Sequence, residues 1–137
     1  MRSNVTLDTL HQIIQKAMGW KGYHRHQHSF AQKYYGTPYP IHDEFDMEIL
    51  KERNITLGQF QFAPKKGSKL KYEYAFGDSW IHLIKVEQMI ADDPGFSRPE
   101  CLSGENACPP EDVGGVWGYA VVQLPLDAIT DALVLRQ

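Results

Sequence analysis

The chain has 137 residues, a hydrophobic content of 42% and a formal net charge of −3 at neutral pH. This length suits one domain with a hydrophobic core of its own, so we expect a single domain over residues 1–137. The mildly acidic balance excludes a protein that is drawn to nucleic acid by a strong overall positive field.

The cysteine count and the apolar runs indicate the compartment. The two cysteines, Cys101 and Cys108, are too few for a disulfide framework. No apolar run approaches the roughly 20 residues of a transmembrane helix, and no signal peptide precedes the first expected helix. We therefore expect a cytoplasmic protein with reduced thiols and no membrane partner.

The first expected element is an amphipathic helix over Leu7 to Met18. Thr6 suits the N-cap position, and Gly19 suits the left-handed position that ends a helix. Apolar residues recur at helical spacing, which predicts one stripe that a sheet must cover.

The next stretch, His24 to Phe30, alternates as a strand does, with three histidines on one face. Gly36, Pro38 and Pro40 then indicate a loop over Tyr34 to Asp46. Further along, we expect a short helical or extended piece over Ile49 to Asn54, a single helical turn over Leu57 to Phe60, and a turn over Lys65 to Ser68.

A hairpin is the clearest pattern in the chain. Leu70, Tyr72, Tyr74 and Phe76 share one face of a strand, and Trp80, His82, Ile84 and Val86 alternate in the same way on the next. Gly77-Asp78-Ser79 joins the two strands, and Gly77 is the residue expected to take a positive φ.

A long loop follows, over Asp92 to Gly115, with four prolines and both cysteines. A loop of this length is usually either functional or mobile. Because this one is rich in proline, we expect it to be ordered and packed on the hairpin. Trp117 and Tyr119 are expected to anchor it in the core. Pro125 limits any last helix to about Leu126 to Leu135.

Three segments resemble the plasmid pRiA4b ORF-3-like family. Tyr74 to His82 reads Y-A-F-G-D-S-W-I-H, and Cys101 to Tyr119 contains C-P-P-E-D-V-G-G-V-W-G-Y. The helix with Ala17-Met18-Gly19-Trp20 and His24-Arg25-His26 is the third match. The resemblance implies an accessory or interaction domain found on plasmids and mobile elements, in a largely uncharacterised family with some members labelled transposon-associated and resolvase-like.

The chain departs from that family at both ends. Family members usually begin with a strand and a Pro-Pro segment ahead of the helix, whereas this chain begins almost at the helix, and Pro125 interrupts the usual last helix. We therefore expect a shortened N-terminus and an atypical segment after residue 120. A sheet edge left unpaired would favour self-association into a homo-oligomer.

A metal site is one candidate for chemistry, with a divalent ion such as zinc as cofactor. Histidines at i and i+2 on a strand project from one face about 6–7 Å apart, so His24 and His26 could converge on one ion. The alternative is that the histidines and cysteines are packed core residues. The candidate ligands are His24, His26, Asp78, His82, Cys101, Cys108, Glu111 and Asp112.

An acid–base pair is a second candidate. Asp78 lies in the hairpin turn and His82 follows on the next strand, so the carboxylate could orient the imidazole for hydrolase-like catalysis. The alternative is that Asp78 caps the turn by bonding backbone N–H groups. Glu111 and Asp112 could likewise serve a cation, or only cap the turn that follows.

Weak nucleic-acid binding is a third candidate. Residues 51–71 contain six basic residues against one acidic residue, Glu52, with Phe60, Phe62 and Tyr72 between them for stacking. The contacting residues would be Lys65, Lys66, Lys69 and Lys71. The alternative is a solvated basic surface, and no helix-turn-helix or zinc-finger pattern supports this function.

Together these patterns predict an α+β fold. We expect a small, mostly antiparallel sheet of three or four strands, with the Leu7–Met18 helix on one face and the Cys101–Tyr119 loop over the hairpin. The leading function is a non-catalytic accessory or interaction domain. The alternative is a metal-binding protein or enzyme that uses the histidine and carboxylate set.

Overall fold

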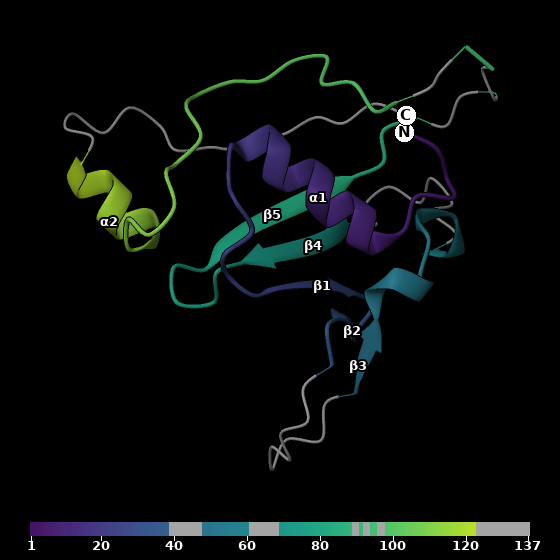
Figure 1. Ribbon diagram of the computed structural model, residues 1–137, viewed down its shortest axis with the longest axis horizontal. Helices are drawn as coiled ribbons and strands as arrows, with labels where there is room; N and C mark the ends of the chain where they lie inside the picture. Colours follow the sequence, from purple (N-terminus) through teal and green to yellow (C-terminus); the bar gives the residue numbers. More distant parts are fainter. Residues whose placement is uncertain (39–47, 61–68, 89–90, 92–93, 96–97, 123–137) are drawn as a thin grey trace.

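The computed structural model describes residues 1–38, 48–60, 69–88, 91, 94–95 and 98–122. Within them the chain forms one five-stranded mixed sheet and two α-helices, which confirms a small α+β fold. Figure 1 shows α1 lying across one face of the sheet, with α2 at the far end of the loop that follows β5.

Helix α1 spans Leu7–Met18, as the sequence predicts. The Thr6 side chain accepts a hydrogen bond from the Thr9 N–H, and Gly19 takes a left-handed conformation with φ 73°. Both ends of the helix are therefore capped, which satisfies backbone groups that have no partner within the helix. Its buried stripe consists of Leu7, Leu10, His11, Ile14, Gln15 and Met18.

The sheet has the strand order β3-β2-β1-β4-β5. The strands are β1 (His26–Phe30), β2 (Lys33–Gly36), β3 (Ile49–Lys51), β4 (Lys69–Tyr74) and β5 (Trp80–Lys85). All neighbours are antiparallel except β2 and β3, which run parallel. Five strands form where the sequence predicts three or four.

The additional strand is β2, in a stretch predicted to be a loop from Tyr34. Ala31 and Gln32 connect β1 to β2 with φ values of 47° and 64°. Two positive φ values in a row are typical of the tight turn that joins neighbouring antiparallel strands. Residues other than glycine and asparagine rarely adopt it, so the sequence carries no signal for this turn. The rest of the predicted loop, from residue 39, lies outside the described residues.

Two short 3-10 turns follow β3: η1 (Glu52–Asn54) and η2 (Leu57–Phe60). The predicted piece over Ile49 to Asn54 is therefore both extended and helical, and the predicted turn after Thr56 is confirmed. The predicted turn at Lys65 to Ser68 and the last helix near Leu126 lie outside the described residues.

The hairpin of β4 and β5 is confirmed, with a different connection. Leu70, Tyr72, Tyr74, Trp80 and His82 are all buried and form the inner face under α1. The positive φ values of the connection fall on Ala75 and Ser79, not on Gly77.

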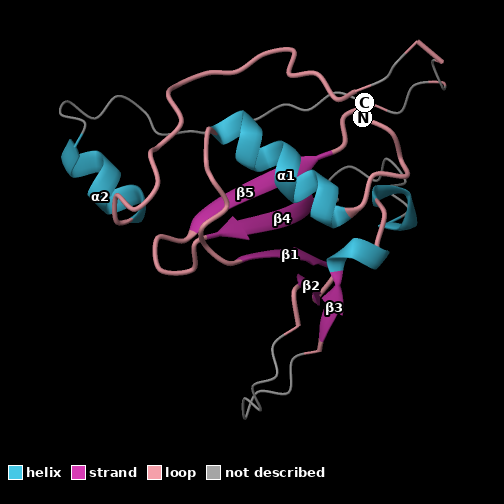
Figure 2. Ribbon diagram, viewed as in Figure 1, coloured by secondary structure: helices cyan, strands magenta, loops and turns pink. Residues whose placement is uncertain are grey.

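Phe76 is 42% exposed, so it does not continue the inner face. The exposed residues of β4 and β5 lie on the opposite face of the sheet. Figure 2 shows β4 and β5 side by side beneath α1.

Candidate functional site

Trp20 connects the loop that precedes α2 (Gly115–Val122) to the core. The Trp20 ring is buried and stacks on Tyr74 with 4.8 Å between ring centroids. Its indole Nε1 donates a hydrogen bond of 2.7 Å to the Pro109 carbonyl. The predicted packing of the loop on the hairpin is therefore present in its described part.

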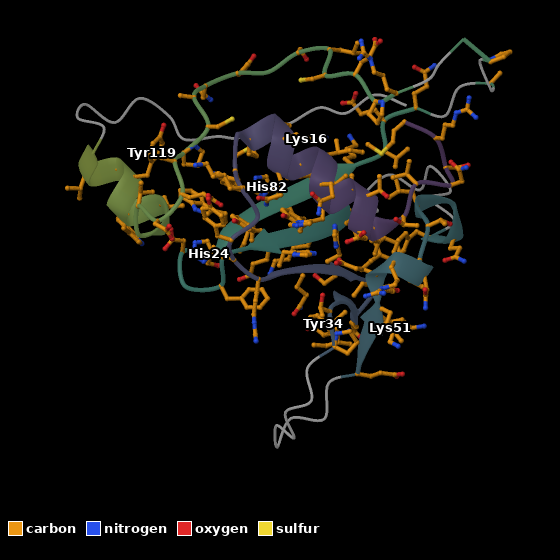
Figure 3. The ribbon with its side chains drawn as sticks, in the orientation of Figure 1. Lys16, His24, Tyr34, Lys51, His82 and Tyr119 are labelled. Atoms are coloured by element: carbon orange, nitrogen blue, oxygen red, sulfur yellow. The ribbon has the colours of Figure 1, made fainter. Side chains whose placement is uncertain are left out.

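Carboxylates of the same loop bind side chains next to the hairpin. Tyr74 donates a short hydrogen bond to Glu111, and His24 Nε2 lies 2.5 Å from Asp112 Oδ1. Burial, and then the Glu111 carboxylate, raise the pKa of Tyr74 to about 12. These contacts place His24 with the loop and not with His26. Figure 3 shows His24 at the end of the sheet near α2, far from Lys51 at the other side.

Asp78 and His82 occupy different surroundings. The Asp78 carboxylate accepts a hydrogen bond of 3.3 Å from the Gly114 N–H, which is a structural contact between hairpin and loop. His82 is buried on the inner face, where Trp20 lies edge-on to its ring with 5.6 Å between centroids. The described contacts of these two side chains do not join them into the predicted acid–base pair.

Neither cysteine forms a disulfide, and both are exposed. The Cys101 thiol donates to the Ser103 carbonyl, and the Cys108 thiol lies 3.7 Å from the Ala17 carbonyl. The described cysteine contacts therefore bring no thiolate to the histidines.

Trp117 is 86% exposed on α2, so the prediction that it anchors the loop in the core is wrong. Tyr119, predicted alongside it, is buried and packs edge-on against Trp80, with 6.3 Å between ring centroids. Its hydroxyl donates to the Ala107 carbonyl. One aromatic residue of the pair therefore anchors the loop and the other faces solvent.

The basic residues of the 51–71 stretch have few aromatic side chains beside them. Lys69 and Lys71 lie on the outer face of β4, whereas Tyr72 is fully buried on the inner face. Phe60 packs against Phe30 and Tyr35. Lys65, Lys66 and Phe62 lie outside the described residues. The predicted stacking surface therefore lacks Tyr72.

A second polar cluster, which the sequence did not predict, lies between α1 and the sheet. His26 and His28 of β1 face Glu52, the first residue of η1. Glu52 is only 5% exposed and His28 is fully buried. His26 Nε2 lies 2.8 and 2.9 Å from the two Glu52 oxygens, and His28 Nδ1 lies 3.3 Å from Oε2.

The charge of Glu52 is fixed by competing effects. Burial raises the pKa of its carboxyl group, but the contacts with His26 and His28 outweigh burial and lower the pKa to about 2. Burial lowers the pKa of His28. The cluster therefore presents one carboxylate to two imidazoles in a setting shielded from water.

Further polar groups hold this cluster in place. The His11 ring stacks on His26 with centroids 3.5 Å apart and planes 6° from parallel. The Tyr72 hydroxyl bonds His11 Nδ1 at 2.8 Å and accepts a hydrogen bond from Gln15 Nε2 at 2.9 Å. Burial, followed by the nearby His26, lowers the pKa of His11 to about 4. His11 of α1 thus fixes the orientation of the His26 ring.

Replacing Tyr72 with phenylalanine should lower the free energy of unfolding by about 1–3 kcal/mol, because Gln15 and His11 lose a buried partner. Urea unfolding measures the change. Tyr34→Phe is the control, since Tyr34 is half-buried on the other face and should change stability by less than about 0.5 kcal/mol. Equal effects of the two variants would contradict the importance of the buried hydroxyl.

The chain matches the plasmid pRiA4b ORF-3-like protein family over residues 1–131. It belongs to this family. The residues that suggested the resemblance now have roles: Trp20 and the Cys-Pro-Pro-Glu-Asp segment hold the loop against the hairpin. The family name and its relatives assign no biochemical activity.

The chain is also similar to two further proteins. The chain is 35% identical over 116 residues to the uncharacterized protein y4hQ of Sinorhizobium fredii, covering 84% of this chain and 57% of that protein. It also resembles the crystal structure of MM3350, a protein of unknown function from Methanosarcina mazei Go1. That match has a TM-score of 0.75 and 29% identity, and covers 87% of this chain and 65% of that one. The chain spans less than two thirds of either relative.

Within the part of the chain that the structure describes, no helix has the length and apolar character to cross a membrane.

Proposed function

We propose that this pRiA4b ORF-3-like chain is a non-catalytic accessory domain of the plasmid or mobile-element kind that acts through protein–protein contacts. The structural contacts of the predicted catalytic residues support this proposal. Asp78 bonds backbone, and Glu111 and Asp112 bind side chains at the loop, so these groups act in architecture. The family name, which refers to a plasmid open reading frame, supports the plasmid association.

The outer strand of the sheet is the observation that carries the proposal. β5 is the last strand in the sheet order, so one of its edges has no partner among the described strands. Ile81 and Leu83 are 52% and 60% exposed on its outer face. An unpaired edge offers a row of backbone donors and acceptors to another strand. With exposed apolar side chains beside it, this edge is suited to β-strand pairing.

A second copy of the chain is the partner that this edge matches. In an antiparallel pair of β5 strands centred on His82, Ile81 of each copy lies opposite Leu83 of the other, because opposite residues share a face. The strand therefore complements itself in apolar contact.

Size-exclusion chromatography with light scattering tests this proposal. A six-residue strand pair buries little surface, so we expect a weak dimer with a dissociation constant of about 1 µM to 1 mM. Leu83→Lys should restore the monomer, because it places a charge in the middle of the edge.

Val121→Lys provides the matched control. Val121 is 74% exposed on α2, so this variant carries the same substitution away from β5 and should leave the dimer unchanged. A wild-type chain that stays monomeric at about 1 mM would overturn the proposal. So would a dimer that dissociates with Val121→Lys and persists with Leu83→Lys.

A further inference from the structure

A second site, independent of the proposed sheet contact, lies under α1. One ligand atom from each of His26, His28 and Glu52 lies within 4.8 Å of the other two. The sequence places these groups on two distant elements, and the fold brings them together. We propose that His26, His28 and Glu52 bind one divalent transition-metal ion of the zinc class.

The separations of the ligand atoms suit an ion of this size. Two donors that each lie about 2.05 Å from one tetrahedral ion are about 3.3 Å apart. His28 Nδ1 and Glu52 Oε2 are 3.3 Å apart, and His26 Nε2 is 2.8 Å from Oε1. An ion therefore requires the His26–Glu52 pair to open by about half an ångström, and the two imidazole nitrogens, which lie within 4.8 Å of each other, to come to about 3.3 Å apart.

His28 supplies an independent observation that points to a ligand. Its side chain is fully buried, and neither ring nitrogen makes a hydrogen bond within the described residues. The 3.3 Å contact with Glu52 has the distance of an ion pair but lacks hydrogen-bond geometry. A buried imidazole without a hydrogen bond is unfavourable, because it has given up its bonds to water. Coordination through Nδ1 gives the nitrogen that faces Glu52 a partner.

Surrounding groups fix the ligands before an ion arrives. His11 stacks on His26, and Tyr72 holds His11 from the other side. Such outer contacts set the orientation of a ligating histidine and increase metal affinity. The site is thus preorganised by a side chain of α1 and a side chain of β4.

The donor types select the kind of metal. Two imidazoles and one carboxylate favour zinc and neighbouring first-row ions, whereas calcium and magnesium prefer oxygen ligands alone. Three protein ligands leave one position of a tetrahedral site for water. Because the ligands come from η1 and β1, the ion would hold these two elements together.

The experiment uses the full chain, purified without a histidine tag and stripped of metal with a chelator. Zinc is added against a chromophoric competitor, and cobalt is added in parallel for its visible absorption. We expect one ion per chain and tetrahedral cobalt bands. At a hundredfold excess of zinc over its dissociation constant, we expect a rise in Tm of about 5–10 °C.

Variants separate this site from other histidines. Glu52→Gln and His28→Gln should each weaken zinc binding at least about 100-fold, because each removes a direct ligand. His24→Gln is the matched control, since His24 contacts Asp112 at the loop and should leave binding unchanged.

The wild-type titration decides the matter even where a variant fails to fold. Less than one ion per chain with no cobalt bands would overturn the site, since Glu52 would then act only in an ion pair with the histidines. Binding that survives in folded Glu52→Gln and disappears in His24→Gln would also overturn it.

Discussion

Replacing Trp20 with alanine is expected to lower the free energy of unfolding by about 3–5 kcal/mol. The ring is 6% exposed and lies against Tyr74, Trp80 and His82, so its removal leaves a large cavity. The variant also removes the indole donor to Pro109, which holds the loop. Urea unfolding should show the loss of stability, and limited proteolysis should show faster cleavage near Pro109.

Trp117→Ala is the control for Trp20→Ala. The same substitution at a tryptophan that is 86% exposed should change stability by less than about 0.5 kcal/mol. If the two variants lost similar stability, Trp117 would be part of the core as the sequence predicts, and the arrangement described for the loop would be wrong.

Replacing Gly115 with alanine is expected to lower the free energy of unfolding by about 2–4 kcal/mol. Gly115 has a φ of 71°, which is costly for a residue with a Cβ, and an added Cβ would lie 2.3 Å from the Asp78 carbonyl oxygen. Because that atom belongs to backbone, the loop must move away from the hairpin. Thermal unfolding measures the loss.

Gly104→Ala provides the comparison for Gly115→Ala. An added Cβ at Gly104 meets no atom within 4 Å, and its φ is not in the left-handed region. This variant should be neutral or slightly stabilising, because alanine restricts the unfolded chain. A Gly115→Ala protein as stable as Gly104→Ala would contradict the close contact between loop and hairpin.

Local patterns predicted the elements whose signals lie within a few residues. Thr6, the apolar stripe and Gly19 define α1, and strict alternation defines β4 and β5. Strand β2 was missed because its turn uses Ala31 and Gln32, which give no turn signal. Alternation also does not reveal where a strand ends, so Phe76 was assigned to a face that it does not occupy.

The site was predicted less well than the fold, because it depends on contacts between distant segments. His26 was identified, but its partner Glu52 lies in a basic stretch and gave no sign of burial. His28 shares a face with His26 in the alternation and was the signal that could have completed the site. No pattern in the sequence pairs His24 with Asp112 across the long loop.

The two edge strands of the sheet differ in length, and this difference limits how large an assembly the chain can form. β3 has only three residues and runs directly into η1, so its outer side, which pairs with none of the described strands, offers little backbone for another strand. If two copies pair through β5 as proposed, each copy uses its long edge, and the pair is closed. The shortness of β3 would then disfavour growth beyond two copies into fibrils.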